Sequence, residues 1–105
     1  MQNTAMTTPL NNTEKNEQHV MAEIMKAIAH PDRVAILSLL CRKKSKKLMV
    51  KTIYEELGLQ QPIVSRHLNI MKNAGVVKRL QEGQKTFYCL CNEKKFVQSL
   101  SKCFC

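Results

Sequence analysis

The sequence has no tryptophan, few other aromatic residues and no long hydrophobic run. Three Phe and two Tyr are the only aromatic residues among 105, so aliphatic side chains must fill any core. No segment approaches the roughly 18 consecutive apolar residues that a membrane-spanning helix needs. The first 17 residues are polar and lack the hydrophobic region of a secretory signal. We therefore expect neither a membrane protein nor a secreted precursor. The length predicts one domain, because domains usually run to about 100–150 residues.

Acidic residues are also scarce, at 8 against 17 Lys and Arg, which gives a net charge of +9. The excess lies in residues 42–105. This segment holds all but three of the 17 basic residues, but only four of the 8 acidic residues. Such a basic block indicates an anionic partner, most commonly nucleic acid. A membrane surface would require a basic helix with an unoccupied apolar face, which the pattern does not show. The charge alone leaves open a basic surface that has no anionic partner.

The five cysteines are an odd number, and without a secretory signal this argues against a disulfide framework. Reduced thiols in the cytoplasm are therefore expected. Cys41 stands alone, Cys89 and Cys91 form one Cys-x-Cys pair, and Cys103 and Cys105 form another at the end of the chain.

Apolar residues recur at helical spacing from residue 18 onward. Residues 1–17 show no such periodicity and are expected to form a flexible arm, which leaves residues 18–105 as the folded domain. Helices are predicted over residues 18–29, 31–42 and 49–57. The apolar stripes of the first two contain Val20, Met21, Ile24, Met25, Ile28, Val34, Leu37 and Leu40.

A fourth helix is predicted over residues 62–73, beginning at Gln61-Pro62 and ending before Gly75. Only three or four residues, with Gly58 as a left-handed cap, separate it from the third helix. So tight a joint is typical of a helix-turn-helix.

The pattern then changes to a period of two. Residues 76–80 and 85–90 predict a β-hairpin whose turn lies at residues 81–84. A last helix over residues 93–103 places Phe96, Val97, Leu100 and Cys103 on one stripe. The predicted fold is therefore mostly α with a β-hairpin wing, a winged helix-turn-helix.

The fourth helix has the two faces that a DNA-reading helix requires. Val64, Leu68 and Met71 predict a buried face, and polar and basic side chains lie on the opposite arc. His67 lies between the two faces and is expected to make a packing or phosphate contact more than a base contact. An ordinary solvated helix surface is the alternative. The DNA-binding candidates are Gln60, Gln61, Ser65, Arg66, His67, Asn69 and Lys72, with Arg79, Gln81, Gln84 and Lys85 of the wing, and Lys51 and the lysines of residues 43–47 add attraction to phosphates.

Four motifs occur in the order and spacing of the ArsR/SmtB-type bacterial repressors. The stretch Met25–Leu37 resembles their opening helices, Leu57–Leu68 their recognition segment, and Ala74–Arg79 with Glu82–Leu90 their wing. The resemblance covers about residues 19–104. It implies a homodimeric repressor with its first and last helices at the dimer interface. It also implies a double-stranded DNA operator that is an imperfect palindrome, and release by a metal ion or a thiol-reactive signal.

The metal sites that the resemblance implies are missing. Met49 and Lys51 replace the two cysteines of the family's Cys-x-Cys motif on the third helix. On the last helix, Asn92-Glu93-Lys94 stands in place of the Asp-x-His of the zinc site, and no His follows. A thiol modification, or a soft metal ion bound elsewhere, remains as the signal.

Some relatives sense persulfide or oxidant through one Cys of the second helix and one of the last. The resemblance therefore makes Cys41, with Cys103 or Cys105, the candidate pair. Cys41 lies one turn, about 5.4 Å, beyond the corresponding position, which is Ser38 here. The alternative is that Cys41 is a small buried hydrophobic residue.

Cys89 and Cys91 are weaker candidates, for a soft-metal or arsenite site. They share the strand face opposite Tyr88 and Leu90, which we expect in the core. A strand splays two such sulfurs, and the spacing matches no familiar zinc pattern.

The sequence therefore favours a DNA-binding transcriptional repressor. One alternative is a winged-helix module that binds proteins without reading DNA, whose exposed helix face should be more apolar. Another is a repressor that responds to no small inducer. An enzyme is not expected, because His19, His30 and His67 are scattered and no nucleophile stands beside a base.

Overall fold

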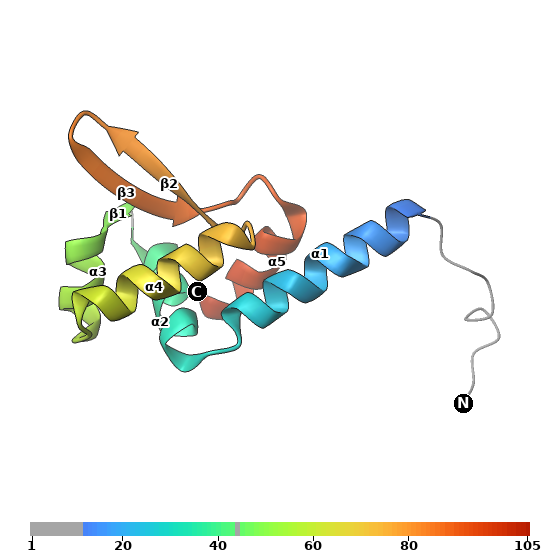
Figure 1. Cartoon of the computed structure of the whole chain (residues 1–105), viewed down its shortest axis with the longest axis horizontal. Coiled ribbons are helices and arrows are strands. Elements are labelled where there is room, and N and C mark those ends of the chain that lie inside the picture. The colour runs from blue at the N-terminus through green and yellow to red at the C-terminus, as the bar shows by residue number, and fades with distance from the viewer. Residues whose placement is uncertain (1–11, 44) are drawn as a thin grey trace.

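The computed structural model describes residues 12–43 and 45–105, so most of the predicted N-terminal arm lies outside the described residues. Within them, five helices surround one core and a small sheet projects from it (Figure 1). The order is that of the predicted winged helix-turn-helix, with an additional short strand before the third helix. The elements are α1 (Asn12–Ile28), α2 (Pro31–Arg42), β1 (Leu48–Met49), α3 (Val50–Leu57), α4 (Gln61–Asn73), β2 (Val77–Glu82), β3 (Lys85–Leu90) and α5 (Lys95–Phe104).

Helix α1 begins earlier than the apolar pattern predicts. It starts at Asn12, so residues 12–17 are helical, and their assignment to a flexible arm is wrong. Residues 15–20 are exposed, and a helix end with no buried face leaves no apolar periodicity to detect. Lys15, Glu17 and Gln18 are good helix formers, which extend a helix without burial.

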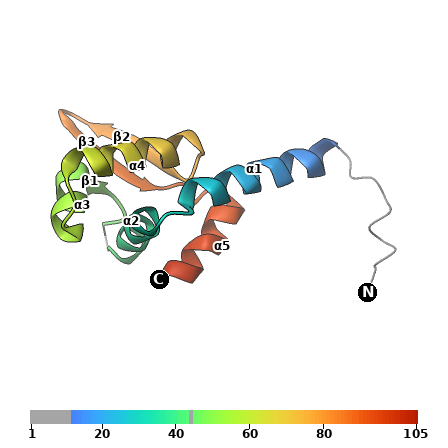
Figure 2. The same cartoon turned by 60° about the horizontal axis from the view of Figure 1, so that its bottom comes forward.

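Three apolar side chains that the pattern predicts to be buried are exposed. Val20, Met25 and Val34 expose 46%, 49% and 38% of their surface. Helix α1 extends beyond the body of the molecule, so only its C-terminal half reaches the core (Figures 1 and 2). The apolar stripes of α1 and α2 are thus wider than the surface that one copy of the chain covers.

The core is aliphatic, as the composition predicts. It draws side chains from all the described helices and from the start of β2, and no aromatic side chain is among its most buried members in the described chain. The almost wholly buried side chains are those of Ile24, Ile36, Leu37, Leu40, Ile53, Val64, Leu68, Met71, Val76, Val77 and Val97.

The sheet is antiparallel, with the strand order β1-β3-β2. Strand β1 was not predicted, because two residues carry too little pattern. The hairpin pairs as far as Glu82 with Lys85, so its turn is Gly83-Gln84 and not the four residues predicted. Gly83 has a φ of 63°, and glycine with positive φ is favoured at the first position of a two-residue hairpin turn.

Helix α5 starts two residues later than predicted. Cys103, which the pattern places on its apolar stripe, is exposed, and Phe104 packs against the core instead. Neighbouring helical residues point about 100° apart, so an error of one position moves a side chain off the buried face. None of the described helices combines the length and the apolarity needed to cross a bilayer.

Candidate nucleic-acid interface

The joint between α3 and α4 places α4 across one side of the molecule. Gly58 has a φ of 67°, the left-handed cap predicted for it, and the Leu59 N–H donates to the Tyr54 carbonyl oxygen at 3.0 Å. Pro62 occupies the first turn of α4, where its missing N–H costs no helical hydrogen bond. Figure 1 shows α4 running from α3 toward the base of the wing.

Helix α4 presents the two predicted faces. Val64, Leu68 and Met71 are fully buried. On the opposite arc Ser65 is half-buried, and its hydroxyl accepts a hydrogen bond from the Gln61 amide at 3.0 Å. The exposed polar and basic residues are Gln60, Gln61, Arg66, Asn69, Lys72 and Asn73, of which Asn73 is not among the predicted candidates.

His67 does not belong to the outward face. Its side chain is 6% exposed, and its Nδ1 accepts a hydrogen bond from Arg33 Nε at 3.0 Å. His67 is thus packed inside the protein in this structure, and we do not place it among the residues that contact DNA. The helical spacing already indicates this burial. Residue 67 follows Val64 by three and precedes Met71 by four, which places it on their face.

The wing presents Arg79, Gln84 and Lys85 to solvent, as predicted. Gln81 is also exposed, but its side chain holds the turn. Its amide donates to the Gly83 carbonyl oxygen at 3.1 Å and accepts from the Thr86 hydroxyl at 2.9 Å. Gln81 thus supports the tip of the wing, and the other three are available to a partner.

Two lysines of the basic loop are paired with acids. Lys43 Nζ lies 2.8 Å from Glu56, and Lys47 forms an ion pair with Glu82. These carboxylates offset the positive charge that was predicted to attract phosphates. Lys51, in α3, is exposed and takes part in none of the ion pairs found in residues 12–43 and 45–105.

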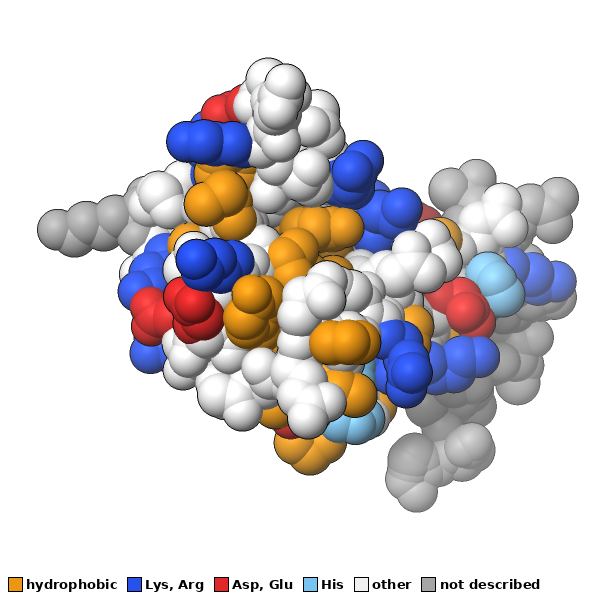
Figure 3. Space-filling model, turned by 60° about the vertical axis from the view of Figure 1, so that its left-hand side comes forward, with side chains coloured by type: hydrophobic (Ala, Val, Ile, Leu, Met, Phe, Trp, Pro, Cys, Tyr) orange, Lys and Arg blue, Asp and Glu red, His pale blue; other side chains and the backbone are white. Residues whose placement is uncertain are grey.

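The end of the molecule that carries α3, the start of α4 and the wing is therefore polar and basic. Figure 3 shows Lys and Arg side chains spread around this end, with acidic side chains next to some of them and uncharged and hydrophobic side chains between them. Such a surface suits a polyanion better than the apolar core of a protein interface.

The predicted thiol pair is brought together where the end of α5 meets α2 (Figure 2). Cys41 and Cys105 form a disulfide, with their Cα atoms 6.0 Å apart. This structure therefore shows the pair in its oxidised form, whereas the sequence predicts reduced thiols throughout. Cys103 is exposed and free, because residue 103 points away from α2.

Cys89 and Cys91 are both buried, together with Leu90, while Tyr88 is half-buried. The expected alternation of buried and exposed side chains fails here, because Cys91 lies beyond the end of β3. Its N–H donates to the Val76 carbonyl oxygen at 2.9 Å. Burial raises the pKa of both thiols above the ordinary value, which disfavours the reactive thiolate form.

Among the described residues, one group brings three potential metal-ligating atoms within 4.8 Å of one another: His30, Asp32 and His67. Hydrogen bonds already use this group. The Asp32 backbone N–H donates to His30 Nδ1 at 3.0 Å, and Arg33 Nε donates to His67 Nδ1. In each neutral ring the proton therefore sits on Nε2, the atom that a metal ion would need unprotonated. We describe the group as a hydrogen-bonded network, and no cysteine belongs to it.

The fold and the exposed face of α4 together define a winged helix-turn-helix DNA-binding protein. The sequence model of the family described as bacterial regulatory protein, arsR family, matches residues 30–79. An uncharacterized HTH-type transcriptional regulator of Methanocaldococcus jannaschii is 44% identical over 73 residues, which are 70% of this chain and 80% of that protein.

Proteins of known structure share this fold. The transcriptional repressor PagR of Bacillus anthracis is 40% identical over 73 residues, which are 70% of this chain and 71% of that protein. Its crystal structure superposes with a TM-score of 0.75 and 32% identity, covering 87% of this chain and 99% of PagR. A homodimeric winged helix-turn-helix DNA-binding domain of Mycobacterium bovis superposes with a TM-score of 0.73 at 23% identity, covering 92% of this chain and 82% of that one, which supports the fold alone.

The chain belongs to the ArsR family of bacterial regulatory proteins. It is therefore a DNA-binding transcriptional regulator and not an enzyme, as the four motifs predict.

Proposed function

We propose that the protein is a homodimeric repressor that binds an imperfectly palindromic operator. Helix α4 enters the major groove, where Arg66 contacts guanine and Asn69 or Gln61 contacts adenine. Gln60 and Ser65 lie at the helix end that meets the bases, and Lys72 contacts phosphate. Arg79, Gln84 and Lys85 of the wing reach the backbone or the minor groove. The observation that supports this most is the exposed polar face of α4 opposite its fully buried apolar face.

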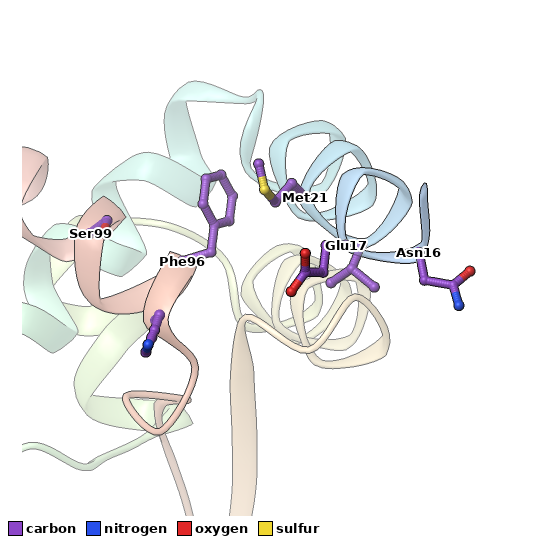
Figure 4. A pocket seen from close by; sticks show the side chains of 7 residues that line it. Asn16, Glu17, Met21, Phe96 and Ser99 are labelled. Atoms are coloured by element: carbon purple, nitrogen blue, oxygen red, sulfur yellow. The ribbon is translucent and has the colours of Figure 1, made fainter. Parts of the chain in front are cut away.

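A second copy of the chain covers α1 and α5 in this proposal. An open groove of about 620 Å³ lies between these helices, and Val20, Met21 and Phe96 line it. Figure 4 shows Met21 of α1 and Phe96 of α5 facing this groove. The exposed apolar side chains of α1 are consistent with an interface that one copy leaves uncovered.

The experiment that tests DNA recognition is selection of duplexes from a random-sequence pool by the full chain. The expected product is a set of related sequences with two half-sites, whose centres lie about 10 base pairs apart or a multiple of that spacing. Enrichment of no sequence, with binding that salt does not weaken, would contradict the proposal.

The signal that we propose is oxidation of a thiol pair in the cytoplasm. Cys41 and Cys105 lose two electrons and two protons to form their disulfide. Hydrogen peroxide that accepts them is reduced to two molecules of water, and a persulfide RSSH that accepts them is reduced to RSH and hydrogen sulfide. The bond ties the end of α5 to the end of α2. Because α5 belongs to the proposed interface, this tie changes how far apart the two α4 helices stand. A soft metal is less favoured, since burial raises the pKa of Cys89 and Cys91 and so opposes the thiolate form that a soft metal binds.

Oxidation should therefore release DNA. We expect a mild peroxide or a persulfide donor to weaken binding of the selected duplex by roughly tenfold, a typical allosteric coupling. Cys41→Ser and Cys105→Ser should each abolish the response, and a fluorescence anisotropy titration measures it.

Cys103→Ser is the matched control, because this exposed thiol lies two residues from Cys105 and is free. It should respond like the unaltered protein. Parallel titrations with zinc and arsenite test the metal alternative. A full response in Cys41→Ser would remove the disulfide from the mechanism.

A further inference from the structure

Helix α4 is joined to the rest of the protein by a polar network that DNA contact itself does not use. Arg33 Nε donates to His67 Nδ1 at 3.0 Å, and Arg33 Nη1 donates to the Ala27 carbonyl oxygen at 3.1 Å. His67 Nε2 lies 3.5 Å from Asp32 Oδ2, and the rings of His30 and His67 have centroids 4.6 Å apart. One guanidinium thus links the last turn of α1, the first turn of α2 and the middle of α4.

We propose that His67 and Arg33 are positioning residues for DNA recognition, which fix the rotation of α4 and do so only while the His67 imidazole is neutral. This inference rests on the proposed function, because it requires that α4 reads bases.

Apolar packing alone leaves the rotation of a helix weakly defined. Val64, Leu68 and Met71 bury one face of α4, but burial is non-directional. The hydrogen bond from Arg33 has a direction, and it ends on the residue next to Arg66. A rotation of α4 that breaks this bond also turns Arg66 and Asn69, whose base contacts need a defined geometry.

The network depends on protonation because both of its donors are fixed. The Arg33 guanidinium and the Asp32 backbone N–H can only donate, so the Nδ1 atoms of His67 and His30 must accept. A proton on His67 Nδ1 would point at the guanidinium, and one on His30 Nδ1 would remove the side-chain cap of α2.

The electrostatics act in the same direction. Burial lowers the pKa of His67 below its ordinary value of 6.5, and the nearby charges of His30 and Arg33 lower it further, against the opposing effect of Asp32. These three are the titratable or charged groups that act on the ring. The native state therefore disfavours the protonated ring. Its contribution to stability is complete above about pH 6.5 and is lost as the pH falls through the lowered pKa.

The first test compares two substitutions. His67→Asn can place an amide oxygen where Nδ1 stands and cannot titrate, whereas His67→Leu fills the space without an acceptor. We measure affinity for the duplex selected by the unaltered protein and for a scrambled duplex, well below each melting temperature. His67→Leu should lower the ratio of the two affinities by roughly tenfold, the effect of losing one hydrogen bond to a charged group, and His67→Asn should retain most of it.

The second test uses pH, where general electrostatics and the network predict opposite signs. Between about pH 7.5 and pH 5.5, added protons should strengthen binding of the scrambled duplex in every variant, because the protein becomes more positive. The affinity ratio should fall in the unaltered protein and stay constant in the His30→Asn/His67→Asn double variant, in which the amide side chain at position 30 can still cap α2. This test holds even where His67→Leu fails to fold.

The inference is overturned when a folded His67→Leu keeps the full ratio, or when the double variant loses it with pH as the unaltered protein does. The inference is also overturned if the affinity ratio of the unaltered protein depends on added zinc and that of His67→Asn does not. The group of His30, Asp32 and His67 would then be a metal site. Failure of the unaltered protein to select any duplex contradicts the proposed function instead.

Discussion

Raising the salt concentration from about 50 to about 200 mM should weaken DNA binding by roughly 10³-fold or more, because each neutralised phosphate releases condensed counterions. Besides the base-reading Arg66, the proposed DNA face carries four exposed basic residues that take part in none of the ion pairs among the described residues: Lys51, Lys72, Arg79 and Lys85. In a dimer they give about eight phosphate contacts, so the logarithm of affinity should fall with the logarithm of salt with a slope of about −7.

The ion pairs supply a matched control for this slope. Lys51→Ala should reduce its magnitude by about two, one for each protomer. Lys43→Ala should reduce it less, because Glu56 already lies 2.8 Å from Lys43 Nζ and offsets its charge. Equal effects of the two substitutions would mean that the basic loop, and not α3, lies against the DNA.

Local patterns predicted the parts of this fold that depend on local physics. The spacing of Val64, Leu68 and Met71 identified the buried face of α4, and glycine identified the caps after α3 and α4. These signals involve residues within a few positions of each other, where helix geometry determines what lies together. The DNA-binding candidates on α4 followed from the same geometry.

Features made by distant residues were not predictable in the same way. The Arg33–His67 hydrogen bond joins positions 34 apart, and periodicity does not register such a pair. The family resemblance suggested a partner for Cys41, but the choice of Cys105 over Cys103 depends on how the last turn of α5 faces α2.

The exposed Val20 and Met25 show a third limit. A hydrophobic stripe predicts burial without saying which surface provides it. On α1 the stripe is wider than the core of one copy can cover, and the proposed dimer explains the difference.

Arg66→Ala should cost about 1–3 kcal/mol of affinity for the selected duplex, and it should relax the base preference at the position that Arg66 contacts. Arg66 is exposed on α4 beside the half-buried Ser65, and its guanidinium can pair with guanine through two hydrogen bonds. Repeating the selection with the variant measures both effects, because lost preference at one base pair in each half-site is distinct from a general loss of affinity.

Lys72→Ala separates base reading from charge. Like Arg66→Ala, it removes one exposed positive charge from α4, but about one and two-thirds turns further along the helix, where we place a phosphate contact. It should weaken selected and scrambled duplexes by similar factors and leave the selected sequence unchanged. If Arg66→Ala behaves in the same way, Arg66 contacts only the backbone, and sequence recognition must then come from the other polar side chains of the α4 face, such as Gln60, Gln61 and Asn69, or from the shape of the DNA.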